Sequence, residues 1–282
     1  MTTYSFSQVD VFGHEALRGN PVAVVHDADG LDDAQMSAFA RWTNLSETTF
    51  LLSPTQPGAD YRLRIFTPDQ ELPFAGHPTL GSAHAWFERG GRPHAPDGVV
   101  QECGAGPVEV RRDGDRLAFR APAFLREGPA DADLVRQVLD CLGPDAAAHV
   151  VDSSWIDNGP GWLGLQLDSA AAVLALAPRF DDLEVDTGVI GPHEPGEAES
   201  IGAGYEVRAF CPGRIGEDPV TGSLNAGFGL WLTRAGALPP DYVVRQGTVL
   251  GADGRVHVST DATGGVWVAG GCRTIVSGTV DL

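Results

Sequence analysis

The sequence of 282 residues contains no lysine, so all 19 of its basic residues are arginine. Pyridoxal phosphate enzymes and Schiff-base aldolases form an imine with a lysine amine, and a Walker A loop also requires a lysine. The GxSxG pattern of the α/β-hydrolase nucleophile is absent as well. The sequence therefore excludes the lysine-dependent classes and the simplest class of serine hydrolase.

Cysteine is scarce, and neither cysteine nor histidine has the spacing of metal ligands. The eight histidines form no HExxH pair, and the four cysteines lie far apart, at Cys103, Cys141, Cys211 and Cys272. Structural zinc sites need closely spaced ligands, and disulfide frameworks are typical of short secreted chains. We expect four separate reduced thiols and no metal site.

Basic charge is also scarce, because 38 acidic residues stand against 19 basic ones and give a formal net charge of −19. Such a surface repels phosphate backbones and anionic lipids, so we expect neither nucleic acid nor a membrane as a partner. No apolar run approaches the ~20 residues that cross a bilayer, and the first residues lack the basic region of a signal peptide. These observations predict a soluble, cytoplasmic protein.

One short pattern occurs twice in the chain. HPTLGSAHA (77–85) and DPVTGSLNA (218–226) share a proline, a glycine, a serine and the last alanine, and each has an ionisable residue before the proline. LRIFTP (63–68) and VRAFCP (207–212) precede the two copies and both resemble strands that end at proline. The repeat therefore predicts two related halves.

Each copy begins a segment that predicts a buried helix. TLGSAHAWFERG and VTGSLNAGFGLWLTRAG are largely apolar, with the proline suited to the first helical turn and Gly90 or Gly236 suited to the C-terminal cap. A helix that is apolar nearly all round must be buried on nearly all sides, and the flanking segments alternate as strands do. We expect an α/β (α+β) fold of two pseudo-symmetric domains, each a curved sheet wrapped around one central helix.

The boundary between the two domains is expected near the APAF segment. The predicted N-terminal domain covers residues 1–122 and the predicted C-terminal domain covers 123–270, with a final strand at about 271–282 that returns to the first domain. More polar helices are expected on the outside at about 32–43 and 131–142.

The start of each central helix exposes backbone N–H groups that have no partner within the helix. Such an end carries about half a positive charge and favours an anion by ~0.3–1 kcal/mol, or up to ~2 kcal/mol where it is partly buried. Two related domains facing each other would bring both ends to one cleft. The repeat therefore predicts a site for a small carboxylate.

Several motifs together resemble the PhzF family of phenazine-biosynthesis isomerases. They are ELPFAGHPTLG, GEDPVTGS, GNPVAVV (19–25) and NLSETTF (44–50), with RQGTVLGADGRVHV and VWVAGGCRTIVSG nearer the end. The resemblance runs along the whole chain and implies the diaminopimelate epimerase fold, catalysis without a cofactor, and a homodimer. It also implies a small unsaturated carboxylic acid as substrate, such as trans-2,3-dihydro-3-hydroxyanthranilate.

By this resemblance, Glu47 is the catalytic acid–base that removes a proton from one carbon and returns it to another, an effect typically worth ~10²–10⁴-fold in rate. His77 matches the family's active-site histidine, and Asp218 is either a helix cap or a catalytic partner. If Asp218 lies near Glu47, repulsion would raise the pKa of one of the two, and the sequence does not say which. Residues matching the substrate pocket are Asn20, Ser46, Gly76, Gly222 and Ser223.

Other functions stay open at this stage. Related epimerases carry a cysteine at each helix start, whereas this sequence has His77 and Asp218 there, which disfavours racemisation by paired cysteines. A cofactor-independent amino-acid or hydroxy-acid racemase would instead use Glu47 and Asp218 as opposed bases. A non-enzymatic binding protein with the same fold is the second alternative.

Overall fold

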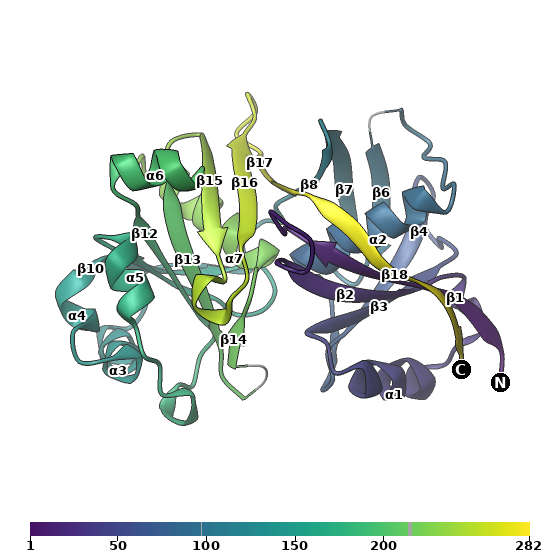
Figure 1. The fold of residues 1–282 in the computed structure, drawn as a ribbon, viewed down its shortest axis with the longest axis horizontal. Coiled ribbons are helices and arrows are strands. Elements are labelled where there is room, and N and C mark those ends of the chain that lie inside the picture. The colour runs from purple at the N-terminus through teal and green to yellow at the C-terminus, as the bar shows by residue number, and fades with distance from the viewer. Residues whose placement is uncertain (97, 214–215) are drawn as a thin grey trace. The chain divides into compact units, whose positions relative to one another are not determined.

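A computed structural model gives the fold and describes residues 1–96, 98–213 and 216–282. The chain divides into two compact units, one formed by Met1–Arg120 with Ala269–Leu282 and the other by Ala121–Val268. Figure 1 shows that each unit has its own set of curved strands and its own central helix.

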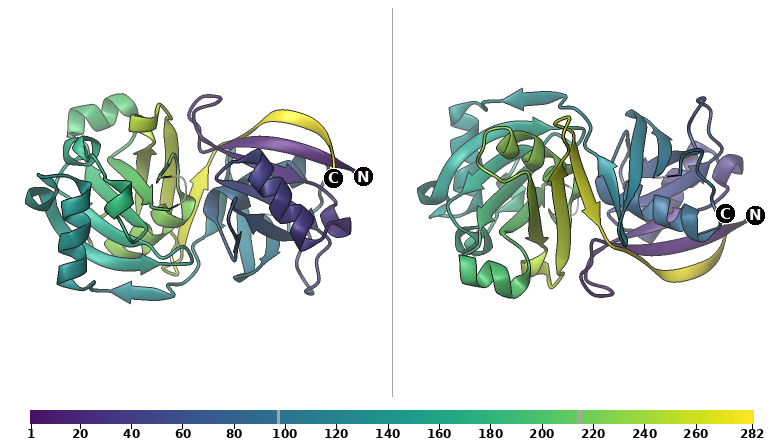
Figure 2. Two further views of the ribbon diagram at one scale, coloured as in Figure 1. Left: turned by 90° about the horizontal axis from the view of Figure 1, so that it is seen from below. Right: turned by 90° about the horizontal axis from the view of Figure 1, so that it is seen from above.

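The N-terminal unit is a strongly curved sheet. Its strands pair in the order β18–β1–β2–β3–β4–β6–β7–β8, with β5 on β4, and only β2–β3 and β4–β6 of these pairs are parallel. Figure 2 shows β18 lying along β1 near the two chain ends. The strands are β1 (Thr3–Val11), β2 (Asn20–Val25), β3 (Glu47–Leu52), β4 (Tyr61–Phe66), β5 (Glu71–Leu72), β6 (Gly98–Cys103), β7 (Gly106–Asp113), β8 (Arg116–Arg120) and β18 (Cys272–Asp281).

The central helix of this unit is α2 (Gly76–Glu88), and most of its residues are buried. It contacts strands from β1 to β4 as well as β7, β8 and β18, so it runs inside the curve of the sheet (Figure 1). A Cβ at Gly81 would lie 2.4 Å from Cγ1 of Val22, so the close approach of helix and strand requires glycine there. Two further helices are α1 (Asp33–Thr43), begun by a capping box at Asp32, and the short 3₁₀-helix η1 (Ala28–Gly30).

The C-terminal unit repeats this sheet. Its strands pair in the order β9–β10–β11–β12–β13–β15–β16, with β14 on β13, and only β11–β12 and β13–β15 of these pairs are parallel. The strands are β9 (Arg126–Gly128), β10 (Val150–Asp157), β11 (Leu163–Leu167), β12 (Thr187–Pro192), β13 (Tyr205–Cys211), β14 (Gly216–Asp218), β15 (Asp241–Gln246) and β16 (Gly254–Thr260). The strand β17 (Val266–Gly270) begins in this unit and ends in the N-terminal unit.

The central helix of this unit is α7 (Gly222–Phe228), which is buried along its whole length and continues into the π-helical turn η3 (Gly229–Thr233). It contacts β10, β11 and β16. The remaining helices are α3 (Ala132–Leu142), α4 (Ala146–His149), α5 (Ala170–Ala175), α6 (Pro195–Ile201) and the short 3₁₀-helices η2 (Phe180–Asp182) and η4 (Thr248–Leu250).

The two units share strand order, the positions of their parallel pairs and a buried central helix. The predicted α/β fold of two similar units, each a curved sheet around one helix, is therefore confirmed. The two more polar helices predicted at about 32–43 and 131–142 are confirmed as α1 and α3.

One of the two predicted helix starts needs correction. We expected Pro78 and Pro219 in the first turn of their helices. Pro78 is the third residue of α2, which begins at Gly76, so this prediction is confirmed, whereas α7 begins only at Gly222. Pro219 thus lies outside its helix, and Thr221 occupies the position before the first helical residue. The interpretation of Asp218 as the helix cap is wrong, because Asp218 ends β14 three residues earlier than Thr221.

The four cysteines are free thiols; Cys103, Cys141 and Cys211 are buried and Cys272 is partly buried, which confirms the prediction of separate thiols. Across residues 1–96, 98–213 and 216–282, no group of three or more histidine, cysteine or acidic residues could hold a metal ion. No helix in these ranges has the length and apolar character needed to cross a membrane.

Candidate functional site

The candidate site of the N-terminal unit lies where α2 begins. Glu47 is the first residue of β3 and Asn20 is the first residue of β2, and these strands are parallel, with Val22 opposite Glu47. Two parallel strands start at the same edge of a sheet, and His77, the second residue of α2, reaches both residues. The fold therefore brings together three residues that are far apart in the sequence.

His77 is the centre of this group. Its Nε2 atom lies 3.3 Å from Oε2 of Glu47, and its Nδ1 atom lies 3.2 Å from Nδ2 of Asn20. His77 and Asn20 are buried, while 12% of the Glu47 side chain is exposed. The Glu47 side chain is thus partly exposed, while its Oε2 atom is buried against His77.

Burial lowers the pKa of His77 to about 3, and a hydrogen bond to the Pro21 carbonyl opposes this only in part. The imidazole is therefore uncharged at neutral pH. Its contact with Glu47 is a contact between a neutral ring and a carboxyl group, although the geometry alone would fit an ion pair. A neutral imidazole donates from one nitrogen and accepts at the other, which suits it to orient a carboxyl or a ligand.

The other two predicted residues of this unit flank the group. Gly76 is the buried first residue of α2, directly before His77. Ser46 is half-buried and directly precedes Glu47. Gly76 has no side chain of its own that would block a close approach to the backbone at the start of the helix.

In the C-terminal unit, the predicted residues Asp218, Gly222 and Ser223 lie at the end of β14 and the start of α7. All three are buried. The Thr221 hydroxyl lies 2.5 Å from Oδ2 of Asp218 and donates to it. The same turn therefore contains a carboxyl group and the first N–H groups of the central helix, which have no partner within the helix.

Ser223 has a fixed hydrogen-bonding direction. The indole Nε1 of Trp162 donates to Oγ of Ser223 at 3.1 Å, and Nδ2 of Asn158 donates to the Ser223 backbone carbonyl at 2.9 Å. An indole N–H can only donate, so Oγ is the acceptor in this contact. Within the described part of the chain, no group accepts the Ser223 hydroxyl hydrogen. The serine can therefore donate to a ligand.

Sequence reasoning missed Trp162, Asn158 and Gln246. Asn158 and Trp162 flank a Gly-Pro-Gly turn in DNGPGW, and Gln246 ends β15 directly before Gly247. A polar residue at the end of a strand beside glycine is the signal that could have identified them, since such turns bring the backbone close to other groups.

Glu217 belongs to β14 and forms two hydrogen bonds of 2.8 Å with the guanidinium of Arg208, and both side chains are buried. This paired geometry holds β14 against β13 and thereby fixes the position of the neighbouring Asp218.

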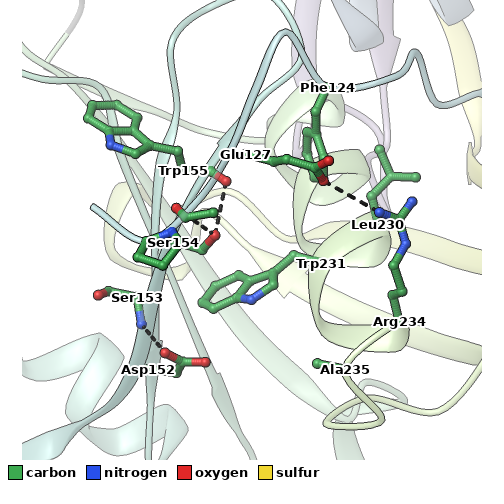
Figure 3. A pocket seen from close by; sticks show the side chains of 12 residues that line it. Phe124, Glu127, Asp152, Ser153, Ser154, Trp155, Leu230, Trp231, Arg234 and Ala235 are labelled. Carbon is green, nitrogen blue, oxygen red and sulfur yellow. Dashed lines mark hydrogen bonds and ion pairs between the residues drawn. The ribbon is translucent and has the colours of Figure 1, made fainter. Parts of the chain in front are cut away.

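The C-terminal unit also has a pocket of about 400 Å³ at the far end of its central helix (Figure 3). Trp231 and Arg234 come from the helix side, and Arg234 forms an ion pair of 3.4 Å with Glu127. Asp218, Gly222 and Ser223 do not line this pocket. This pocket is therefore not the candidate site, although it is large enough for a small ligand.

Comparison with known proteins gives relatives along the whole chain. A family model described as phenazine biosynthesis-like protein matches residues 9–278. The chain is 38% identical to antisense-enhancing sequence 1 of Schizosaccharomyces pombe, over 99% of each chain. It is 33% identical to a trans-2,3-dihydro-3-hydroxyanthranilate isomerase of Pseudomonas aeruginosa, over 91% of this chain and 90% of the relative. A solved PhzF-family structure from Enterococcus faecalis, 24% identical, superposes with a TM-score of 0.78 over 100% of both chains, which shows the same fold.

Proposed function

Because this chain belongs to the phenazine biosynthesis-like (PhzF) family and is an isomerase, we propose that it moves a proton between two carbons of a small unsaturated carboxylic acid by general acid–base catalysis. The observation that carries the proposal is the contact between Glu47 and the uncharged, buried His77. A single carboxyl that is oriented yet partly exposed suits a transfer in which one group removes and returns the same proton.

In this proposal the Glu47 carboxylate takes a proton from one carbon, and the electron pair left behind spreads into the unsaturated system of the substrate. The carboxylic acid so formed then gives the proton to a second carbon, which restores the carboxylate. His77, held by Asn20 and the Pro21 carbonyl, orients Glu47. No redox change and no second substrate is needed.

We propose Asp218 as a further catalytic residue. We propose as substrate-binding residues Asn20, Ser46, Gly76, Gly222 and Ser223. The orientation of the Ser223 hydroxyl supports a role as donor to an anionic group such as a carboxylate. The name of the Pseudomonas aeruginosa relative supports a substrate similar to trans-2,3-dihydro-3-hydroxyanthranilate.

The experiment is a screen of cyclic unsaturated acids for thermal stabilisation, followed by reaction of the best ligand in deuterated water. We expect product that is isomerised, with solvent deuterium at the carbon that receives the proton wherever Glu47 exchanges before returning it. Glu47→Gln should lower turnover by about 10²–10⁴-fold while binding is largely kept, because shape and donors survive.

The matched control is Glu199→Gln, which removes an exposed carboxyl outside both groups and should leave turnover unchanged. Turnover by Glu47→Gln within a few-fold of the wild-type rate would contradict the role of Glu47. Inversion of one stereocentre with deuterium wash-in, and no isomerisation, would instead favour a racemase.

A further inference from the structure

A buried hydrogen-bond network surrounds Asp218. It contains Asp218, Thr221, Asn225 and Gln246, whose exposed fractions are 7%, 6%, 0% and 0%. These residues come from β14, the turn before α7, α7 itself and the end of β15. Buried polar networks of this kind are costly unless each member is satisfied, so the direction of every hydrogen bond has consequences.

The amide of Gln246 can have only one orientation. Its Oε1 atom lies 3.0 Å from the backbone nitrogen of Thr221 and 3.0 Å from Nδ2 of Asn225. A backbone N–H only donates, so the atom facing it must be the amide oxygen. Asn225 is fixed in the same way, because its Nδ2 atom also donates to the Thr221 carbonyl at 2.9 Å.

With that orientation, Nε2 of Gln246 faces the other side of the network. It donates to Oγ1 of Thr221 at 2.9 Å and to the backbone carbonyl of Asp218 at 3.2 Å. Thr221 Oγ1 therefore accepts from Gln246, and its own hydrogen points to Oδ2 of Asp218, 2.5 Å away. The backbone N–H of Thr221 thus fixes the orientation of the Gln246 amide, and the amide fixes the orientation of the Thr221 hydroxyl. As a result, the hydroxyl donates to Asp218.

The backbone beside Gln246 is constrained to keep this contact. Gly247 has φ of +94°, and a Cβ there would lie 2.6 Å from the carbonyl oxygen of Pro219. The turn that contains Asp218 and Pro219 is thus packed directly against the end of β15. Only glycine permits this approach, which holds Gln246 at the Asp218 turn.

We propose that Gln246 is a positioning residue which, through the Thr221 hydroxyl, keeps the Asp218 carboxyl ionised and orients it as an acceptor for the reaction. A hydrogen bond donated to a carboxyl oxygen favours its charged form. The inference rests on the proposed function for its use of Asp218 in the reaction, while the direction of the network rests on the contacts alone.

Charged groups on the neighbouring elements are already paired. Glu217 on β14 bonds to Arg208 on β13, and Arg245 on β15 bonds to Asp253 at 2.8 Å. Substitutions at Thr221 and Gln246 do not remove a member of either pair. A change in the ionisation of Asp218 in such variants is therefore assigned to the network.

The test compares Thr221→Val, which removes the hydroxyl at nearly constant shape, with Thr221→Ser, which keeps it. The readout is the ionisation midpoint of Asp218, measured by carboxyl ¹³C NMR in the ligand-free protein. The valine variant should raise the midpoint by about one pH unit or more, and the serine variant should stay close to the wild type. Thr221→Ala removes the same hydroxyl and is the substitute if the valine variant does not fold.

Gln246→Met tests the direction of the network without adding a charge. Methionine has a similar length but cannot donate to the Thr221 hydroxyl oxygen, so the hydroxyl hydrogen is no longer directed at Asp218. We expect the Asp218 midpoint to rise, by no more than in Thr221→Val. Unchanged midpoints in the hydroxyl-free variant and in Gln246→Met would overturn the inference.

Turnover separates this inference from the proposed function. If Asp218 takes part in the reaction as its ionised form, the acidic limb of the pH–rate profile should move upward with the NMR midpoint in each variant. A shifted Asp218 midpoint with an unchanged pH–rate profile would support the network but contradict a role of Asp218 in the reaction. An unshifted Asp218 midpoint would contradict the network, whatever the activity of the variant.

Discussion

The two units have the same strand order but differ at the residue that starts the fourth strand of each, which is β3 in the N-terminal unit and β12 in the C-terminal unit. In the N-terminal unit β3 begins with Glu47, opposite Val22, and in the C-terminal unit β12 begins with Thr187, opposite Leu163. Thr187 is fully buried, and its hydroxyl donates to the Val185 carbonyl at 3.0 Å. The repeated fold therefore supplies the same position twice but places a carboxyl there once, which agrees with a reaction that uses one acid–base.

The serine that occurs in both copies of the repeat also has different surroundings in the two units. Ser82 lies inside α2, where its Oγ is 2.9 Å from Oγ1 of Thr49. Ser223 is the second residue of α7 and is oriented by Trp162. Because α2 starts before its proline and α7 starts after, identical residues of the repeat lie at different depths in the two helices. Similar sequence thus preserves packing without preserving chemistry.

Removing each serine hydroxyl in turn tests whether Ser82 and Ser223 have different roles, and it should give the largest effect on KM. Ser223→Ala should raise the KM for a carboxylate substrate by about 10–100-fold, since it removes a donor to a charged group. Ser82→Ala should leave KM unchanged and lower the free energy of unfolding by about 1 kcal/mol. Steady-state kinetics and urea denaturation of both variants give the two numbers. Equal effects on KM would show that the two serines are equivalent after all.

A smaller effect is expected at Trp162, which touches the reaction only through Ser223. Trp162→Phe should raise KM by about tenfold, because the serine hydroxyl loses the donor that fixes its direction. In the Ser223→Ala background the same substitution should have little further effect on KM. A double-mutant cycle measures this coupling. Additive effects on KM would mean that the indole contributes only to packing.

The remaining prediction concerns a pH dependence of stability in the N-terminal unit. The pKa of His77 is about 3 in the folded chain and about 6.5 in an unfolded one, so the unfolded state binds more protons between these values. Stability from this group is complete above about pH 6.5 and is lost as the pH falls toward 3. Burial likewise lowers the pKa of His26 to about 4.

His77→Asn should therefore flatten the fall in unfolding free energy between pH 6.5 and 3, by up to about 1.4 kcal/mol per pH unit. Denaturant unfolding of the wild type and the variant across this range measures the difference. Parallel curves for the two proteins would contradict a buried, uncharged His77.

Much of the fold could be predicted because each signal was local. Alternating apolar residues identified strands such as β1, β4 and β13, and the apolar segments after Pro78 and Pro219 identified the central helices. The family resemblance supplied Glu47, His77 and Asn20, which the structure brings into one group. It did not supply the distances or the neutral state of His77, which depend on burial.

The rest depended on contacts between distant residues. β12 contains Gly188, Gly191 and Pro192, residue types that are depleted in strands, and its sequence alone gave no strand signal. At Thr221, directly before α7, the backbone N–H donates to the Gln246 amide across a separation of 25 residues. No periodicity in the sequence could reveal such a contact.

The pairing of β18 with β1, from Thr3 opposite Asp281 to Val11 opposite Cys272, affects how the protein is made. During translation the strand that completes the N-terminal unit leaves the ribosome only after all of Ala121–Val268 has been synthesised. The N-terminal unit is therefore the first to be started and the last to be completed, and one edge of β1 stays unpaired until β18 is synthesised. The C-terminal unit is one continuous segment and can fold as it emerges. The unpaired edge of β1 is therefore the part of the nascent chain that stays exposed longest, and the part that a chaperone would have to protect.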